Sequence, residues 1–224
     1  MKKKIASLVM NIVTVLSVIV GVLMIFLIEM PQAGAAADST FRTFRYFTTD
    51  SNLLMGIFAL VFLIDQILEL KGKIQEIPSY VYLLKLIGTV QVSVTFFTVV
   101  FYLAPALGEN FYVMFLGHNF FYHLFVPVLS MVSFLFLEKT DKIRFRGTFL
   151  SMLPVLVYGI YYMANAFLHM TDGKVPPEYD WYGFAQGGVA LSFVAFIAMM
   201  IATYLITLLF WFLNRKRKKK EKQR

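Results

Sequence analysis

Two histidines and a run of hydroxyl, carboxyl and amide side chains are the residues best suited to chemistry in this chain. Residues 48–52 read Thr-Thr-Asp-Ser-Asn directly before Leu53, and His118 and His123 lie together in another apolar segment. Capping a helix needs one such polar residue, so five in a row predict a polar cavity. A threonine hydroxyl becomes a nucleophile when a nearby imidazole takes its proton. Acyl transfer is therefore the chemistry that these groups suit.

Asparagine amides in or near the same segments are candidates for stabilising the oxyanion of such a reaction, because their N–H groups can donate to it. These residues are Asn52, Asn119 and Asn165, and Asp50 is a further supporting residue within the polar run. Hydrogen bonding between neighbouring helices is the alternative role for the same side chains.

No metal or cofactor is expected. His118 and His123 are five residues apart, about 140° around an ideal helix, so both do not face one ion. The chain has no cysteine, which excludes thiolate ligands, disulfides and a cysteine nucleophile. It also lacks a glycine-rich phosphate loop, a GxSxG elbow and an HExxH helix, which are the commonest enzyme motifs.

Two arginines precede the polar run at a spacing of three residues. Arg42 and Arg45 alternate with aromatic residues in the sequence Phe-Arg-Thr-Phe-Arg-Tyr-Phe. One interpretation is an aromatic and basic anchor at the membrane interface, and the other is a clamp on a lipid carboxylate or phosphate.

The elements that position these residues are predicted to be transmembrane helices. The chain has 224 residues, of which 59% are hydrophobic, too many for an ordinary soluble domain to bury. A helix needs about 20 residues to cross the hydrocarbon core, and six apolar stretches reach that length. We expect an all-α, polytopic six-helix bundle, a single domain over residues 1–214, with spans at about 5–28, 48–70, 80–103, 112–137, 148–169 and 187–213.

The distribution of lysine and arginine predicts that both termini are cytoplasmic. Basic residues concentrate at residues 2–4, in two of the loops and in the tail 215–224, whereas the opposite loops hold only Arg42, Arg45 and Lys174. The net charge of +8 therefore indicates a basic tail on anionic lipid rather than nucleic-acid binding. Cleavage of the first span as a signal peptide, at the small residues 33–37, is the rival interpretation.

Two further charged residues lie within the predicted spans. Asp65 is five residues from the inner end of the second span, and Lys85 is five residues after the inner start of the third. Antiparallel neighbours would place them at similar depth, so we expect a structural ion pair between them.

Several segments resemble one family, the androgen-induced six-span membrane hydrolases of fatty-acid esters of hydroxy fatty acids, together with their bacterial relatives. They are Ile-Glu-Met-Pro at residues 28–31, Phe-Thr at 47–48 with Ser-Asn-Leu-Leu at 51–54, His123 before Val-Pro at 126–127, and Trp-Tyr-Gly-Phe at 181–184. The resemblance implies that Thr48 is the nucleophile and His123 its base. Thr49 and His118 stay open as alternatives, because a second threonine follows Thr48 and the spacing from histidine to proline is one residue shorter here.

The resemblance implies a hydrolase of long-chain acyl esters in a cell membrane, the plasma membrane of a bacterium or the endoplasmic reticulum of a eukaryote. Trp181 would belong to an aromatic outer lid over the substrate. His123 is deeper in its span than Thr48, so their pairing predicts an unwound segment at residues 48–52 that dips into the bundle. A small transporter or lipid-binding protein, with a polar intramembrane site and no covalent step, is the competing hypothesis.

Overall fold

In a computed structural model, which describes residues 2–29 and 42–222, the chain forms helices through all of its apolar segments. Six of these helices are long and apolar enough to cross a membrane, which confirms the prediction of an all-α, multi-pass membrane protein. The spans are Lys2–Ile28 with α1 (Lys2–Met24), α4 (Phe47–Leu70), Ser79–Ala106 with α5 (Ser79–Thr98) and α6 (Ala104–Ala106), Phe120–Leu137 with α7 (Val126–Val132), Phe145–Leu168 with α8 (Leu153–Leu168), and Gly188–Arg215 within α9 (Gly188–Lys222).

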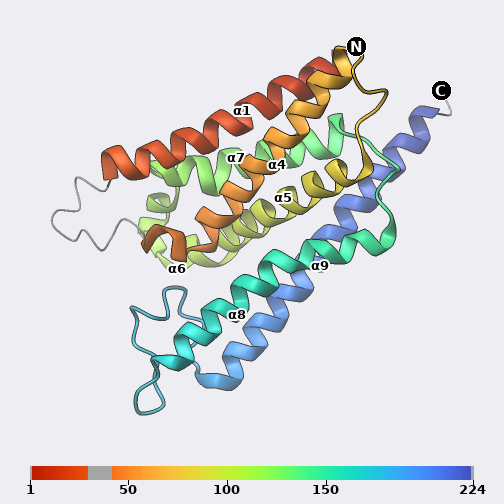
Figure 1. The fold of residues 1–224 in the computed structure, drawn as a ribbon. Helices are drawn as coiled ribbons and strands as arrows, with labels where there is room; N and C mark the ends of the chain where they lie inside the picture. Colours follow the sequence, from red (N-terminus) through yellow and green to blue (C-terminus); the bar gives the residue numbers. More distant parts are fainter. Residues whose placement is uncertain (1, 30–41, 223–224) are drawn as a thin grey trace.

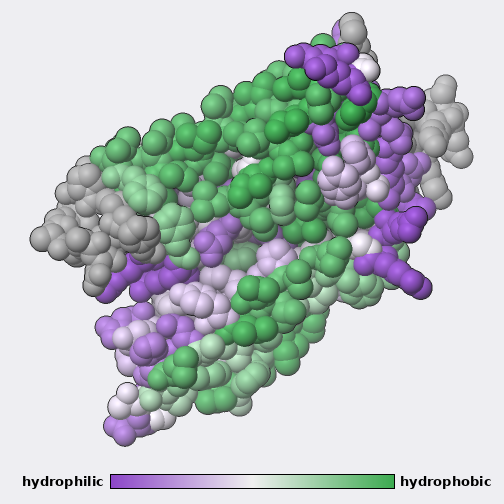
Figure 2. Space-filling view, viewed as in Figure 1, coloured by the Kyte–Doolittle hydropathy of each residue, from purple (hydrophilic) through white to green (hydrophobic). Residues whose placement is uncertain are grey.

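Helix α5 is the centre of the bundle, and every residue from 85 to 95 is buried. Helices α4, α7 and α9 pack against α5, α1 lies on α4 and α7, and α8 lies on α9 (Figure 1). Both ends of the chain lie at the same end of the bundle. Apolar side chains cover most of the visible helix faces, and hydrophilic ones gather toward the two ends of the bundle (Figure 2). This pattern is the one expected of helices whose outer faces contact lipid.

The fourth span is shorter than the sequence predicted. Residues 112–119 lie outside it, because a 3₁₀ segment, Gly108–Phe115, occupies the approach and Gly117 has φ of +58°, a conformation that glycine adopts readily. The helix then runs from Phe120, and its first turns, Phe120–Phe125, are π-helical. Such π-helical turns are often found at functional sites, and this one contains His123.

A buried ion pair joins the third and fourth spans, but its members differ from the prediction. The Lys85 ammonium lies 3.7 Å from the Glu138 carboxylate, and both side chains are buried. The predicted pair of Lys85 with Asp65 is therefore wrong. The Lys85 ammonium also donates to Asn11 Oδ1 of α1.

Helix α1 contributes polar side chains to the same network. Asn11 donates to the Glu138 carboxylate at 2.7 Å and to Gln66 Oε1 at 3.2 Å, and Ser7 donates to Glu138 at 3.0 Å. The Ser133 hydroxyl also donates to this carboxylate. One oxygen, Glu138 Oε1, is therefore contacted by Lys85, Asn11, Ser7 and Ser133. Helix α1 is thus integrated into the core of the bundle.

The small residues 33–37, which the signal-peptide interpretation requires, lie outside the described residues, as do Met30 and Pro31.

Candidate functional site

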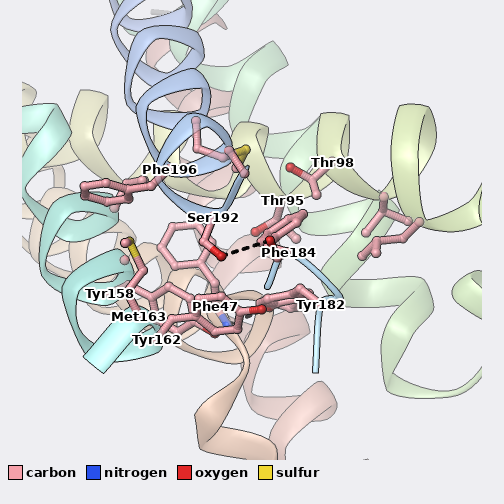
Figure 3. A pocket seen from close by; sticks show the side chains of 17 residues that line it. Phe47, Thr95, Thr98, Tyr158, Tyr162, Met163, Tyr182, Phe184, Ser192 and Phe196 are labelled. Atoms are coloured by element: carbon pink, nitrogen blue, oxygen red, sulfur yellow. Dashed lines mark hydrogen bonds between the residues drawn. The ribbon is translucent and has the colours of Figure 1, made fainter. Parts of the chain in front are cut away.

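An aromatic cavity lies between the first turn of α4, the far end of α5, helices α8 and α9, and the segment before α9. It has an empty volume of about 700 Å³, counting the open space at its mouth, and is lined mostly by apolar atoms. Figure 3 shows its side chains converging from these elements. Its hydroxyl-bearing residues are Thr48, Thr95, Thr98, Tyr158, Tyr162, Tyr182 and Ser192.

Thr48 lines this cavity from a regular helix. Helix α4 is continuous from Phe47, so the predicted unwound segment at residues 48–52 is wrong. The polar run stays helical because its side chains bond within the bundle. Ser51 and Asn52 donate back to the Thr48 carbonyl at 3.1 and 2.8 Å, and Ser51 also pairs with Thr95 of α5 at 2.9 Å.

The start of α4 is capped from a distant part of the chain. The Phe47 N–H donates to the Tyr182 hydroxyl at 2.9 Å, and Tyr46, the residue before the helix, makes no side-chain cap of its own. The Tyr182 hydroxyl also interacts with the side chain of Thr48. Burial raises the pKa of Tyr182 to about 12, so its hydroxyl stays protonated at neutral pH. A protonated phenol therefore lies beside Thr48.

Thr49, the alternative nucleophile, is buried away from the cavity. Its side chain is 2% exposed and pairs with the Thr43 hydroxyl at 3.3 Å. Asp50, the next residue, lies in a separate groove on the lipid-facing side of α4. Thr48 is thus the one residue of the Thr-Thr pair whose hydroxyl a molecule in the cavity would meet.

Asn52 connects the second span to the fourth beside His123. Its amide nitrogen donates to the Thr48 carbonyl at 2.8 Å and to the Tyr122 carbonyl at 3.0 Å. Both N–H groups are used, and Oδ1 has no partner among the described residues. Asn52 therefore positions the turn carrying Thr48 against the turn carrying His123, and it has no spare N–H for an oxyanion.

The imidazole of His123 is held by the backbone. It is 6% exposed, and its Nδ1 lies 2.6 Å from the Met114 carbonyl oxygen. Because a carbonyl only accepts, Nδ1 carries the proton and Nε2 is left as an acceptor, the form that a general base needs. The ring of His118 is half-buried and packs edge-on against Tyr122, with 5.8 Å between ring centroids. No hydrogen bond in the described part of the chain joins Thr48 to either histidine.

The other predicted residues lie around the cavity rather than in it. Asn165 donates to the Tyr179 carbonyl at 3.4 Å, and Asn119 is half-buried at the start of the fourth span. Arg42 is exposed. The guanidinium of Arg45 stacks on Trp181, 5.2 Å from the ring centroid, and donates to the Glu178 carbonyl.

Trp181 packs in an aromatic cluster beside the cavity but does not line it, so the predicted lid stays a prediction. The indole N–H donates to the Tyr158 hydroxyl at 3.0 Å, and Tyr158 donates to the Arg45 carbonyl at 2.6 Å. Asp180 accepts from Tyr162 and from the Ala185 N–H, which fixes the segment before α9. Tyrosines 158, 162 and 182 were missed as cavity residues, although the spacing of four between the first two places them on one helix face.

Within the described residues, no group of three or more histidine, cysteine or acidic side chains could hold a metal ion. Comparison of the chain with protein-family models, with curated proteins and with solved structures found no match.

Proposed function

We propose that this protein is an intramembrane hydrolase of long-chain acyl esters, with Thr48 as nucleophile and His123 as base. The observation that supports it is the position of Thr48, which lines an aromatic cavity between transmembrane helices. An acyl chain of the ester would fill the cavity while its carbonyl lies at the Thr48 end. The same roles follow from the resemblance to the androgen-induced membrane hydrolases.

The proposed reaction has two steps. Thr48 Oγ1 attacks the ester carbonyl as His123 Nε2 takes its proton, and the tetrahedral intermediate collapses to an acyl-threonine while the proton passes to the departing alcohol. Water, deprotonated by the same imidazole, then releases the fatty acid and restores Thr48. Catalytic hydrogen bonds are often long before substrate binds, so the two side chains would close on each other around the ester.

Tyr182 is the group that we assign to the oxyanion. Tyr158 donates to the Arg45 carbonyl and Tyr162 to Asp180, so their protons are used. The Tyr182 oxygen accepts the Phe47 N–H, which leaves its own proton to donate beside Thr48. Donors placed where the negative charge develops are commonly the largest single contribution to acyl-transfer catalysis.

Labelling of the purified protein with a long-chain alkyl fluorophosphonate tests this function. We expect the probe to label the wild type, Thr49→Ala and His118→Ala, and to fail on Thr48→Ala and His123→Ala. Labelling that survives both of the latter substitutions, or that is absent from the wild type, would contradict the proposal.

The volume of the cavity offers a separate test through Gly159, a lining residue on which the ring of Phe196 packs directly. A Cβ at Gly159 would lie 2.2 Å from the Phe196 ring, so Gly159→Ala must push that ring into the space for the acyl chain. We expect labelling by a long-chain probe to fall by about tenfold, and labelling by a methyl-sized probe to change little. Gly147→Ala is the matched control, because its Cβ would meet Leu83 at an ordinary 3.5 Å. Equal loss with both probes would show damage to the fold instead of occlusion.

The second candidate is a lipid-binding or lipid-transporting protein without covalent chemistry. It is favoured by the interaction of the Thr48 side chain with Tyr182, and by the absence of a hydrogen bond between Thr48 and either histidine in the described part of the chain. A photoreactive fatty acid distinguishes the two functions. Crosslinking to the cavity without fluorophosphonate labelling or ester hydrolysis would establish binding alone.

The proposal also includes an orientation, with both termini in the cytoplasm and the cavity near the outer surface of a cell membrane. It rests on the basic loops and tail, whose side chains beyond residue 215 lie outside the described residues. Because the chain has no native cysteine, single cysteines report the topology directly. A membrane-impermeant maleimide should label intact cells through Gly108→Cys and not through Lys73→Cys, and the reverse result would invert the orientation.

A further inference from the structure

A second groove lies on the lipid-facing side of the bundle, between α4 and α8. It has an empty volume of about 800 Å³ and is lined by Phe47, Asp50, Leu54, Val157, Tyr158 and Tyr161, among others. The rings of Phe47 and Tyr158, with centroids 5.1 Å apart, line both the groove and the Thr48 cavity and so form the wall between them. Val157 is 61% exposed and Tyr161 50%, so the groove opens toward the surrounding lipid.

Asp50 is the charged residue of this groove. Its side chain is half-buried, and in the described part of the chain the carboxylate makes no hydrogen bond and no ion pair. A carboxylate on the lipid-facing side of a transmembrane helix is costly unless a cation neutralises it. Among the described residues, no lysine or arginine forms an ion pair with Asp50, so an external cation would complement this charge.

Arg45 provides the opposite charge next to the same groove. Its guanidinium donates to the Glu178 carbonyl and the Tyr46 hydroxyl and stacks on Trp181. Among the described residues it pairs with no carboxylate, and its buried Nε has no partner. Trp181 in turn packs on Tyr161 of the groove, with ring centroids 6.2 Å apart. A positive and a negative side chain thus flank one aromatic cluster without pairing with each other.

We propose that this groove binds a phospholipid whose zwitterionic headgroup carries a primary ammonium, as in phosphatidylethanolamine. The ammonium donates hydrogen bonds to Asp50 and lies against the aromatic faces of Phe47 and Tyr161, while the phosphate lies on Arg45. One acyl chain runs along Val157 in the groove. A quaternary ammonium has no N–H to donate, so the carboxylate selects the primary amine. This site is separate from the Thr48 cavity and does not depend on hydrolysis.

Native mass spectrometry of the purified full chain tests the proposal with three phospholipids of identical acyl chains, whose headgroups are ethanolamine, choline and glycerol. We expect phosphatidylethanolamine adducts to exceed the other two. Asp50→Asn should lower them by about tenfold, as expected for loss of a charged hydrogen bond, while phosphatidylglycerol adducts change little. Arg45→Gln should lower adducts of all three phospholipids, because all carry the phosphate.

Glu109→Gln is the matched control, since Glu109 is an exposed acid outside the groove, and it should leave the selectivity unchanged. Equal binding of the ethanolamine and choline lipids would overturn the proposed selection by hydrogen bonding. Retained selectivity in Asp50→Asn would overturn the assignment of the site. Neither result bears on fluorophosphonate labelling of Thr48, so failure of this proposal is distinguishable from failure of the hydrolase function.

Discussion

Replacement of Lys85 by methionine is expected to destabilise the bundle by about 3–5 kcal/mol, because it leaves the buried Glu138 carboxylate without its cation. Glu138 is 3% exposed, and one of its oxygens, Oε2, already has no partner among the described residues. Thermal or denaturant unfolding of the purified protein in detergent measures the loss. Lys174→Met is the control, since Lys174 is exposed on a loop.

The double variant Lys85→Met with Glu138→Gln separates loss of packing from loss of charge balance. We expect it to recover most of the stability, since removing both charges avoids an uncompensated buried ion and Gln keeps acceptors for Ser7 and Asn11. An unfolding temperature of Lys85→Met equal to that of Lys174→Met would contradict a structural role for the pair. A double variant less stable than the single one would show that the pair stabilises the fold by more than mutual neutralisation.

Replacement of His123 by alanine is expected to slow hydrolysis of a nitrophenyl ester of a long-chain fatty acid by about 10²–10⁴-fold, the usual contribution of a general base. The effect should appear in kcat and leave KM nearly unchanged, because the ring does not line the cavity that would hold the acyl chain. His118→Ala should retain activity, since its ring packs on Tyr122. Hydrolysis by His123→Ala at the wild-type rate would contradict the assigned base.

The hydrogen bond to Met114 gives a further control for His123. His123→Asn retains a donor that can reach toward the Met114 carbonyl, and it lacks the second ring nitrogen that the mechanism uses. We expect this variant to be as inactive as His123→Ala while unfolding closer to the wild type. Activity in His123→Asn would show that the residue holds the fourth span in place and takes no proton.

The sequence by itself determined the helices and their number. An apolar run of about 20 residues can satisfy its backbone in a membrane only as a helix, so length and composition were sufficient to predict six spans. The break at Gly117 was less visible, because a single glycine also occurs inside helices and only the positive φ distinguishes the two cases. The polar run at residues 48–52 stays a predicted site, and its backbone was misjudged, because α4 is helical from Phe47.

Only the tertiary structure decided which side chains meet. The sequence placed Lys85 and Asp65 at similar expected depths, but the partner of Lys85 depends on how the neighbouring helices pack around it. That packing brings Lys85 next to Glu138. It also places Tyr182 at the first turn of α4, although Tyr182 is more than 130 residues from that turn in the sequence. The Thr48 cavity is a property of those contacts, because it closes only where side chains from five separate segments converge.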